Sequence, residues 1–329
     1  MTPRRVARLV GGAAAVALAA AAAMLAWPAS SVVDGLSMAP GLMPGDVVTT
    51  GWLPIADGMR RPRRFDRWIV AAPGGEPAVK RIAGLPGEAV AIRGGDLIVD
   101  GEAALKPPEV LAELAVPVML PLDTGDRHAG LPADEVVDDV AFAREVNRPL
   151  EVVRDVGIVA LVQTATESSR ATVRLSGITL HWRLPPQSAI RVIAGRLDGH
   201  LVAVAWRDRD SAASAPRRSG LPERVPPAWS FTAPCRGDAP GASGPECRLT
   251  VDGSARIERV TVWRDVHLRP AGDGLASWQL DDASYVVLGD FPTGSIDSRQ
   301  WGPLPARAIR RRIAHMATGR ASTIPDQHE

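Results

Sequence analysis

The stretch AVKRIAGLPGEAVAIRGGDLIVDG, residues 78–101, contains the clearest fold signal of the 329-residue chain. Its segments Ala89–Arg93 and Asp96–Val99 flank Gly94-Gly95, a two-residue loop that can take positive φ at both positions, which predicts a β-hairpin. A second turn at Asp100-Gly101 closes the hairpin, and Ala78–Ala83 before it predicts another strand. This stretch therefore predicts a mainly β, antiparallel structure.

The strand-and-turn pattern continues on both sides of this stretch. Asp46–Trp52 and Trp68–Ala72 are rich in β-branched or aromatic residues and end near Gly or Pro, so each predicts a strand. Residues 103–283 predict an inserted, mostly β subdomain. It contains an acidic helical patch at Asp134–Glu145, and the strands predicted after the patch are Ala171–Leu184, Ala189–Ile193, Leu201–Trp206 and Arg256–Leu268. Within it, Ser211–Glu246 is rich in Pro, Gly, Ser and Ala, which predicts a long surface loop.

The C-terminal part predicts a return to the first unit. Ser284–Leu288 predicts a strand that runs into Gly289, and Leu304–Thr318 predicts an amphipathic closing helix with a solvated basic face. The predicted units are a cytoplasmic N-terminus (1–8), a membrane anchor (9–28), two parts of one β-rich domain (29–102 and 284–329) and the insertion (103–283).

Composition excludes several classes of protein. With 38 Lys+Arg against 37 Asp+Glu, the formal net charge of +1 provides no field to hold a nucleic acid. The 31 Gly and 29 Pro favour short strands and many turns over a helical bundle. The chain has only two lysines, Lys80 and Lys106, so a lysine in an apolar strand indicates a specific role for that side chain.

The N-terminus predicts export. Arg4, Arg5 and Arg8 precede an uncharged run, Leu9–Trp27, that is long enough to cross a bilayer and ends at Pro28. The positive-inside rule places the N-terminus in the cytoplasm and the rest of the chain outside. A cleaved secretory signal is the alternative, and it exports the chain equally.

Two cysteines, Cys235 and Cys247, lie in the Gly/Pro/Ser-rich region. In an oxidising compartment such a pair predicts a loop-closing disulfide, with two buried thiols as the alternative. A lone pair of cysteines is not a zinc site, and no metal-ligand spacing such as H-E-x-x-H occurs, so we expect neither a metal nor another cofactor.

Three segments contain residues that could carry chemistry. The first, SMAPGLMPGD (37–46), holds Ser37 in backbone unsuited to a helix or a sheet, where its hydroxyl can project into a cleft. The second, VKRIAGLPG (79–87), places Lys80 in a partly buried strand, where desolvation lowers the amine pKa and a neutral amine can take a proton from a serine. Taken singly, each also fits a plain reading, a serine in a turn or a lysine facing solvent.

The third segment, GDFPTGSIDSRQWG (289–302), collects hydroxyls, two carboxylates and an arginine in one turn-rich loop. Asp297 and Arg299 can form a charge-assisted pair that holds the loop. A surface loop with an ion pair is the alternative.

In this order behind an N-terminal anchor, the three segments resemble those of the bacterial type I signal peptidases, or leader peptidases. The resemblance implies a β-rich catalytic domain with an insertion of variable size. It implies that Ser37 is the nucleophile, Lys80 the general base and Ser295 the hydroxyl that orients the lysine. Asp297 and Arg299 would form the structural ion pair, and supporting positions would be Gly35, Met38, Pro40 and Asp290.

The chain departs from the family pattern at three places. Gly41 stands where the family has threonine, Phe291 where it has asparagine, and Gly35 where some members have a serine that completes the oxyanion hole. The Ser37 amide would then be the main oxyanion donor, and loss of one such donor typically costs on the order of 100-fold or more in rate.

The implied function is a membrane-anchored serine endopeptidase that removes signal peptides from exported preproteins after an A-x-A-like site. A serine–histidine mechanism is the rival, but none of the six histidines lies in a recognisable nucleophile setting and G-x-S-x-G is absent. A catalytically silent, membrane-tethered binding module is the alternative from another class, motivated by Gly41 and Phe291.

Overall fold

The computed structural model describes residues 30–50, 61–119, 123–131, 136–139, 148–208, 221–222, 224–235, 246–270 and 276–317. The predicted anchor, residues 9–28, lies outside these residues. Among the described residues, none of the helices is long and apolar enough to cross a membrane.

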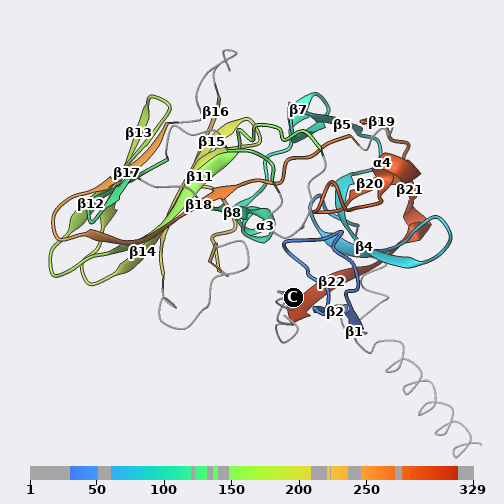
Figure 1. Cartoon of the computed structure of the whole chain (residues 1–329), viewed down its shortest axis with the longest axis horizontal. Coiled ribbons are helices and arrows are strands. Elements are labelled where there is room, and N and C mark those ends of the chain that lie inside the picture. The colour runs from blue at the N-terminus through green and yellow to red at the C-terminus, as the bar shows by residue number, and fades with distance from the viewer. Residues whose placement is uncertain are drawn as a thin grey trace, which may run out of the picture.

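The described residues form four antiparallel sheets arranged in two groups of strands (Figure 1). The first group has a seven-stranded sheet, β1-β2-β22-β3-β4-β20-β21, and a four-stranded sheet, β19-β5-β6-β7. Their bounds are β1 Ser30–Val32, β2 Val47–Thr50, β3 Arg67–Ala71, β4 Pro77–Gly84, β5 Ala89–Arg93, β6 Asp96–Val99, β7 Glu102–Ala103, β19 Ser277–Gln279, β20 Ser284–Leu288, β21 Leu304–Pro305 and β22 Ile309–Ala317.

The second group comes from the middle of the chain. It has a five-stranded sheet, β13-β12-β17-β10-β9, and a six-stranded sheet, β16-β15-β14-β11-β18-β8. The bounds are β8 Val116–Val118, β9 Asp123–Gly125, β10 His128–Gly130, β11 Val156–Gln163, β12 Ser169–Leu175, β13 Ile178–Leu184, β14 Ala189–Leu197, β15 His200–Arg207, β16 Phe231–Pro234, β17 Cys247–Val251 and β18 Arg256–Arg264. The helix α3, Pro108–Leu114, lies between the two groups (Figure 1).

The mainly β, antiparallel prediction is confirmed, and the first hairpin shows why the local sequence decides it. Gly94 and Gly95 take φ of 59° and 97°, the positive values that a tight two-residue turn needs. The strands β5 and β6 pair from Val90 with Val99 to Arg93 with Asp96. Ala171–Leu184, expected as one strand, is instead a hairpin of β12 and β13 that turns at Ser176-Gly177, where both φ values are positive.

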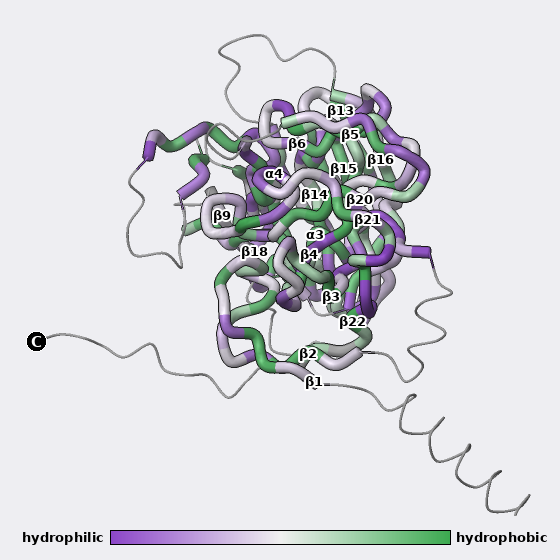
Figure 2. Tube along the Cα trace, turned by 90° about the vertical axis from the view of Figure 1, so that its right-hand side faces the viewer, coloured by the Kyte–Doolittle hydropathy of each residue, from purple (hydrophilic) through white to green (hydrophobic). Residues whose placement is uncertain are grey.

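Separate apolar cores stabilise the two groups. Side chains from both sheets of the second group share one core, which includes Ile158, Val173 and Leu249. The first group has its own clusters, around Trp68 in the seven-stranded sheet and around Trp278 in the four-stranded sheet. Figure 2 shows apolar strands, in green, near the centre of the molecule and hydrophilic segments, in purple, mainly around them.

The predicted C-terminal helix is wrong. Residues 304–317 form β21, a single 3₁₀ turn at Ala306–Ala308, and the nine-residue strand β22. β22 lies between β2 and β3 and pairs with both, so it satisfies backbone groups that a helix there would leave unpaired. Its Arg312 also binds Asp66 across the sheet, with 2.8 Å between Nη2 and Oδ1.

Two predictions for the insertion fall largely outside the described residues. Of the predicted acidic helical patch, residues 136–139 are described, and Val137 forms an isolated antiparallel bridge with Val152. Of the predicted long loop, the described part contains β16, which pairs with β15 from Phe231 with Ala203 to Pro234 with His200.

The expected disulfide is not present, because Cys235 and Cys247 are both thiols. Cys235 follows β16 in the six-stranded sheet, whereas Cys247 begins β17 in the five-stranded sheet. The Cys247 side chain points into the shared core, with its Sγ 3.6 Å from the Ala194 carbonyl oxygen. Burial raises the pKa of the Cys247 thiol to about 12, so the thiol stays protonated.

A buried cluster of charges joins the two groups of strands. Lys106, just before α3, contacts Asp198 in the β14–β15 turn, and its Nζ lies 2.8 Å from Asp265 Oδ2, just after β18. Asp96 of the hairpin hydrogen-bonds to Asp155, which precedes β11 and also accepts the Asp198 amide at 2.6 Å. Burial, reinforced by the neighbouring carboxylates, raises the pKa of Asp155 to about 8, of Asp198 to about 7 and of Asp96 to about 6.

This cluster predicts that stability decreases as the pH rises. The pKa of each of these aspartates is higher in the folded than in the unfolded chain, so their contribution to stability is complete below the unfolded value of 3.8 and is lost as the pH rises through about 6 to 8. We expect the melting temperature to fall by several degrees between pH 5 and pH 8. Asp96→Asn, which donates an amide proton to Asp155, should reduce that fall.

Asp100→Asn is the matched control, because Asp100 is an exposed aspartate of the same hairpin. If the melting temperatures of Asp96→Asn and Asp100→Asn both depend on pH as that of the wild type does, the buried aspartates are not the cause of the pH dependence.

Candidate active site

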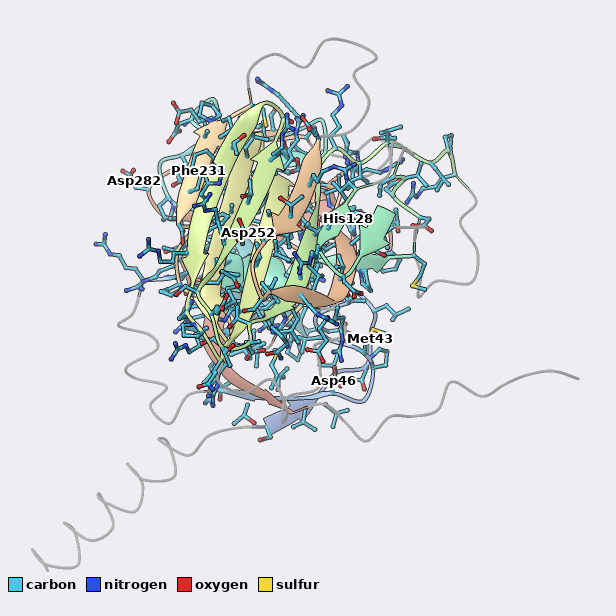
Figure 3. All side chains as sticks on the ribbon, turned by 90° about the vertical axis from the view of Figure 1, so that its left-hand side faces the viewer. Met43, Asp46, His128, Phe231, Asp252 and Asp282 are labelled. Carbon is cyan, nitrogen blue, oxygen red and sulfur yellow. The ribbon has the colours of Figure 1, made fainter. Side chains whose placement is uncertain are left out.

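Ser37 lies in the loop that connects β1 to β2 and is half-buried. The loop is anchored by Met38 and Leu42, whose side chains are buried in one cluster, and the Leu42 amide donates to the Met38 carbonyl at 2.8 Å. Further along the loop, Met43 and Asp46 lie together at the lower end of the molecule in Figure 3, and the Met43 amide donates to Asp46 Oδ2 at 2.8 Å. These contacts hold the Ser37 segment in one conformation without a helix or a sheet.

Lys80 lies on β4, a strand with a neighbour on each side, and is only 3% exposed. It pairs with Trp68 of β3 across the sheet. Its Nζ donates to Ser295 Oγ at 3.1 Å and lies 5.8 Å from the ring centroid of Trp301. The sequence prediction that this lysine is buried beside a hydroxyl therefore agrees with the structure.

Burial lowers the pKa of the Lys80 amine. The charges of Asp297 and Asp290 oppose this effect, and the charge of Arg299 adds to it. Desolvation dominates because ammonium loses more hydration than the neutral amine on entering the protein. The amine is thus easier to deprotonate than an exposed lysine, as a general base requires.

The Asp297 carboxylate organises the loop that carries Ser295. Its Oδ2 accepts hydrogen bonds from Ser295 Oγ and the Gly289 amide, each at 2.8 Å. Asp297 is also the N-cap of the short helix α4, Ser298–Trp301, with a capping box completed by Gln300. Arg299 pairs with the carboxylate through Nε at 2.8 Å and Nη2 at 2.7 Å, and both side chains are 0% exposed. The predicted ion pair therefore forms.

Gly289 brings the Ser37 loop and the Ser295 loop together, a role that its place in the motif did not reveal. A Cβ at this position would overlap the Ser295 side chain and would lie 2.5 Å from the Ser37 carbonyl oxygen. The next residue but one, Phe291, donates its amide to the same carbonyl at 3.1 Å. Only glycine permits this approach.

Asp290, a predicted supporting residue, binds the arginine beside the lysine. Arg81 Nε and Nη2 donate to the two Asp290 oxygens at 2.8 and 2.6 Å. Both side chains are buried, and a bidentate pair of this kind fixes direction as well as distance. The sequence alone indicated no role for Arg81.

The three departures from the family pattern have different surroundings. A Cβ at Gly41 would lie 3.1 Å from the Glu113 carbonyl oxygen, whereas a Cβ at the exposed Gly35 would meet nothing within 4 Å. The ring of Phe291 is buried and covers Gly294, where a Cβ would overlap it. Pro40, another predicted supporting residue, is buried in the same loop as Gly41.

Ser37 Oγ and Lys80 Nζ are not hydrogen-bonded to each other in the described residues. The Nζ bond goes to Ser295, and Ser37 approaches the same place through its carbonyl group. Catalytic hydrogen bonds in enzymes are often long or absent without substrate and tighten in the complex.

Three histidines of the described residues have hydrogen-bond partners other than Ser37. His181 pairs with Thr172, His200 with the Asp198 carbonyl and His267 with Glu151. These three histidines therefore give no support to the rival serine–histidine mechanism.

One group of described residues has the spacing of metal ligands. Asp96, Asp155 and Asp198 place a carboxylate oxygen each within 4.8 Å of one another. Lys106 already contacts Asp198, and Arg196 Nε lies 3.4 Å from Asp155 Oδ1. This cluster contains its own cations and lies at the joint between the strand groups, so we assign it no part in catalysis.

Comparison with known proteins gives one match. Residues 5–117 match the family described as signal peptidase, peptidase S26. The matched residues include Ser37 and Lys80 and end before the segment that contains Ser295. A search among curated proteins found no match.

The buried ion pair predicts that substitutions of Asp297 and Ser295 differ in their effect on the stability of the protein. Asp297→Ala leaves Arg299 charged and buried without its partner, which typically costs about 3–5 kcal/mol. For a chain of this size, that lowers the melting temperature by roughly 10 °C. Ser295→Ala removes a hydroxyl and should lower it much less. Equal melting temperatures of Asp297→Ala and the wild type would contradict this account.

Proposed function

We propose that this chain is a serine endopeptidase that removes signal peptides from exported preproteins, because residues 5–117 match the family of signal peptidases, peptidase S26. The family is one of serine peptidases. The observation that carries the assignment of residues is the buried Lys80 amine, with its lowered pKa, bound to Ser295 beside the Ser37 loop.

In the proposed acylation step, neutral Lys80 takes the proton of Ser37 Oγ as that oxygen attacks the scissile carbonyl carbon. The Ser37 amide donates to the oxyanion that forms. Collapse of the tetrahedral intermediate breaks the C–N bond, and the leaving amine takes the proton from the Lys80 ammonium. This step gives an acyl-Ser37 ester and releases the mature protein.

Deacylation repeats the sequence with water. Lys80 takes a proton from water as the water oxygen attacks the ester carbonyl, and then returns it to Ser37 Oγ as the ester breaks. Ser295 supports both steps because its hydroxyl accepts from Lys80 Nζ while donating to Asp297. That chain of hydrogen bonds holds the amine in place and keeps its lone pair available to the nucleophile.

We propose further that residues 9–28 anchor the chain as a single span, with the N-terminus in the cytoplasm and the catalytic domain on the outer side. The support is the basic–apolar–proline pattern of the sequence. The proposed substrates are preproteins with small residues in an A-x-A-like site, bound as an added β-strand.

A catalytically silent binding module is the second candidate. The observation in its favour is that Ser37 Oγ does not bond to Lys80 in the described residues. This candidate expects substitutions of Ser37 and Lys80 to be equally silent.

The proposed role of Lys80 as general base predicts the effect of replacing it by arginine. Lys80→Arg keeps a long basic side chain but cannot provide a neutral base, because guanidinium stays protonated at any working pH. We expect cleavage of a model precursor by the purified chain to fall by on the order of 100- to 10,000-fold. Ser37→Ala should fall at least as far, and Ser31→Ala, an exposed serine on β1, should not.

Cleavage by Lys80→Arg at the wild-type rate would rule out the lysine as base. Equal rates for wild type, Ser37→Ala and Ser31→Ala would favour the binding module.

The lowered pKa of Lys80 predicts the pH profile of the wild type. Since the unprotonated amine is the active form, kcat/KM should rise with pH until it reaches a plateau below the ordinary lysine value of 10.5. A rise centred near 6.5, the ordinary value of histidine, would instead indicate a histidine base. The measurement is the initial cleavage rate across the pH range in which the protein stays folded.

A further inference from the structure

The helix α3 connects the second group of strands to the candidate active site. Its Leu111 and Ala112 pack into a core with strands of the six-stranded sheet. Val110 and Leu114 pack instead in a cluster that includes Phe65, just before β3. One helix of seven residues therefore contacts both groups of strands.

Glu113 on α3 bridges two arginines of the seven-stranded sheet. Arg67 and Arg81 stand directly opposite each other on β3 and β4, an arrangement in which like charges repel. Glu113 Oε1 lies 2.7 Å from Arg67 Nη2, and Oε2 lies 3.1 Å from Arg81 Nη1. One carboxylate from outside the sheet thus offsets the repulsion between neighbouring strands.

The same arginine leads to the loop behind Ser37. Arg81 binds both oxygens of Asp290 and also donates to the Phe65 carbonyl at 2.7 Å. Asp290 stands between Gly289, which abuts Ser295, and Phe291, whose amide holds the Ser37 carbonyl. A change in the direction of Arg81 would therefore move the support of the nucleophile and of the base together.

The end of α3 also touches the Ser37 loop directly. A Cβ at Gly41 would stand 3.1 Å from the Glu113 carbonyl oxygen and 3.6 Å from both Arg67 Nη1 and Asp290 Oδ2. A Cβ there would require the loop or α3 to shift by a few tenths of an ångström. The glycine at this position is therefore explained by the close approach of the helix.

We infer that Glu113 is a positioning residue of the proposed peptidase, through which the region after residue 103 sets the Ser37 loop against Lys80 and Ser295. Its carboxylate aligns Arg81 with Asp290, and its backbone occupies the space left by Gly41. This inference rests on the proposed function for its catalytic readout, but the geometry can be tested without catalysis.

The test compares the same Glu→Gln substitution at two glutamates of one helix. Glu113→Gln keeps the shape of the side chain and loses the charge shared by the two arginines, whereas Glu109→Gln changes an exposed glutamate of α3. We expect Glu113→Gln to lower kcat about 10-fold at nearly unchanged KM, since displacement of catalytic groups by about 1 Å can cost up to 100-fold. Glu109→Gln should match the wild type.

Hydrogen exchange of the Phe291 amide, followed in the same three proteins, gives a readout independent of activity. It should be faster in Glu113→Gln, because that amide holds the Ser37 carbonyl, and unchanged in Glu109→Gln. Gly41→Ala should slow cleavage similarly, and its effect should not add to that of Glu113→Gln if both act on one contact.

The outcomes separate the inference from the proposed function. If the wild type cleaves and both glutamine variants match it in kcat and in exchange, the positioning role is wrong. If the wild type does not cleave, the proposed function fails, and the exchange data alone decide whether Glu113 holds the loop. A general loss of melting temperature in Glu113→Gln, with uniformly faster exchange, would also overturn the inference, because it would show a purely structural role.

Discussion

The candidate site depends on the hydrogen bonds and the ion pair of the Asp297 carboxylate. Fully buried, this carboxylate accepts hydrogen bonds from Gly289 and Ser295 and pairs with Arg299 through both of its oxygens. A buried carboxylate is tolerable only when its oxygens are bonded and its charge is balanced. Once these bonds form, the directions of α4, of the Ser295 hydroxyl and of the Gly289 backbone are fixed together, and Lys80 meets a hydroxyl that is already oriented.

The two lysines of the chain show how their surroundings decide what a buried amine does. Lys80 and Lys106 are nearly equally buried. Lys80 binds a hydroxyl, so desolvation prevails and lowers the pKa of its amine. Lys106 contacts two carboxylates, which outweigh desolvation and raise its pKa. The first amine is suited to take up a proton, and the second is a permanent cation that holds the two groups of strands together.

The departures at Gly41 and Phe291 fit the surroundings of this chain. Gly41 lies where α3 approaches the Ser37 loop, and Phe291 fills a space above Gly294 while its amide holds the Ser37 carbonyl. Both departures are therefore explained by the packing of this chain.

The sequence by itself determined the hairpin at Gly94-Gly95, the β-rich class, and the three segments that contain Ser37, Lys80 and Ser295, because turn chemistry and short motifs act over a few residues. Tertiary structure alone decided that residues 309–317 form a strand, since β2 and β3 leave a place between them that local periodicity cannot reveal. It alone placed the free thiols Cys235 and Cys247 at strands of different sheets, and it alone brought Glu113 to Arg81. These contacts join residues far apart in the chain, and their energies depend on neighbours that only the folded protein supplies.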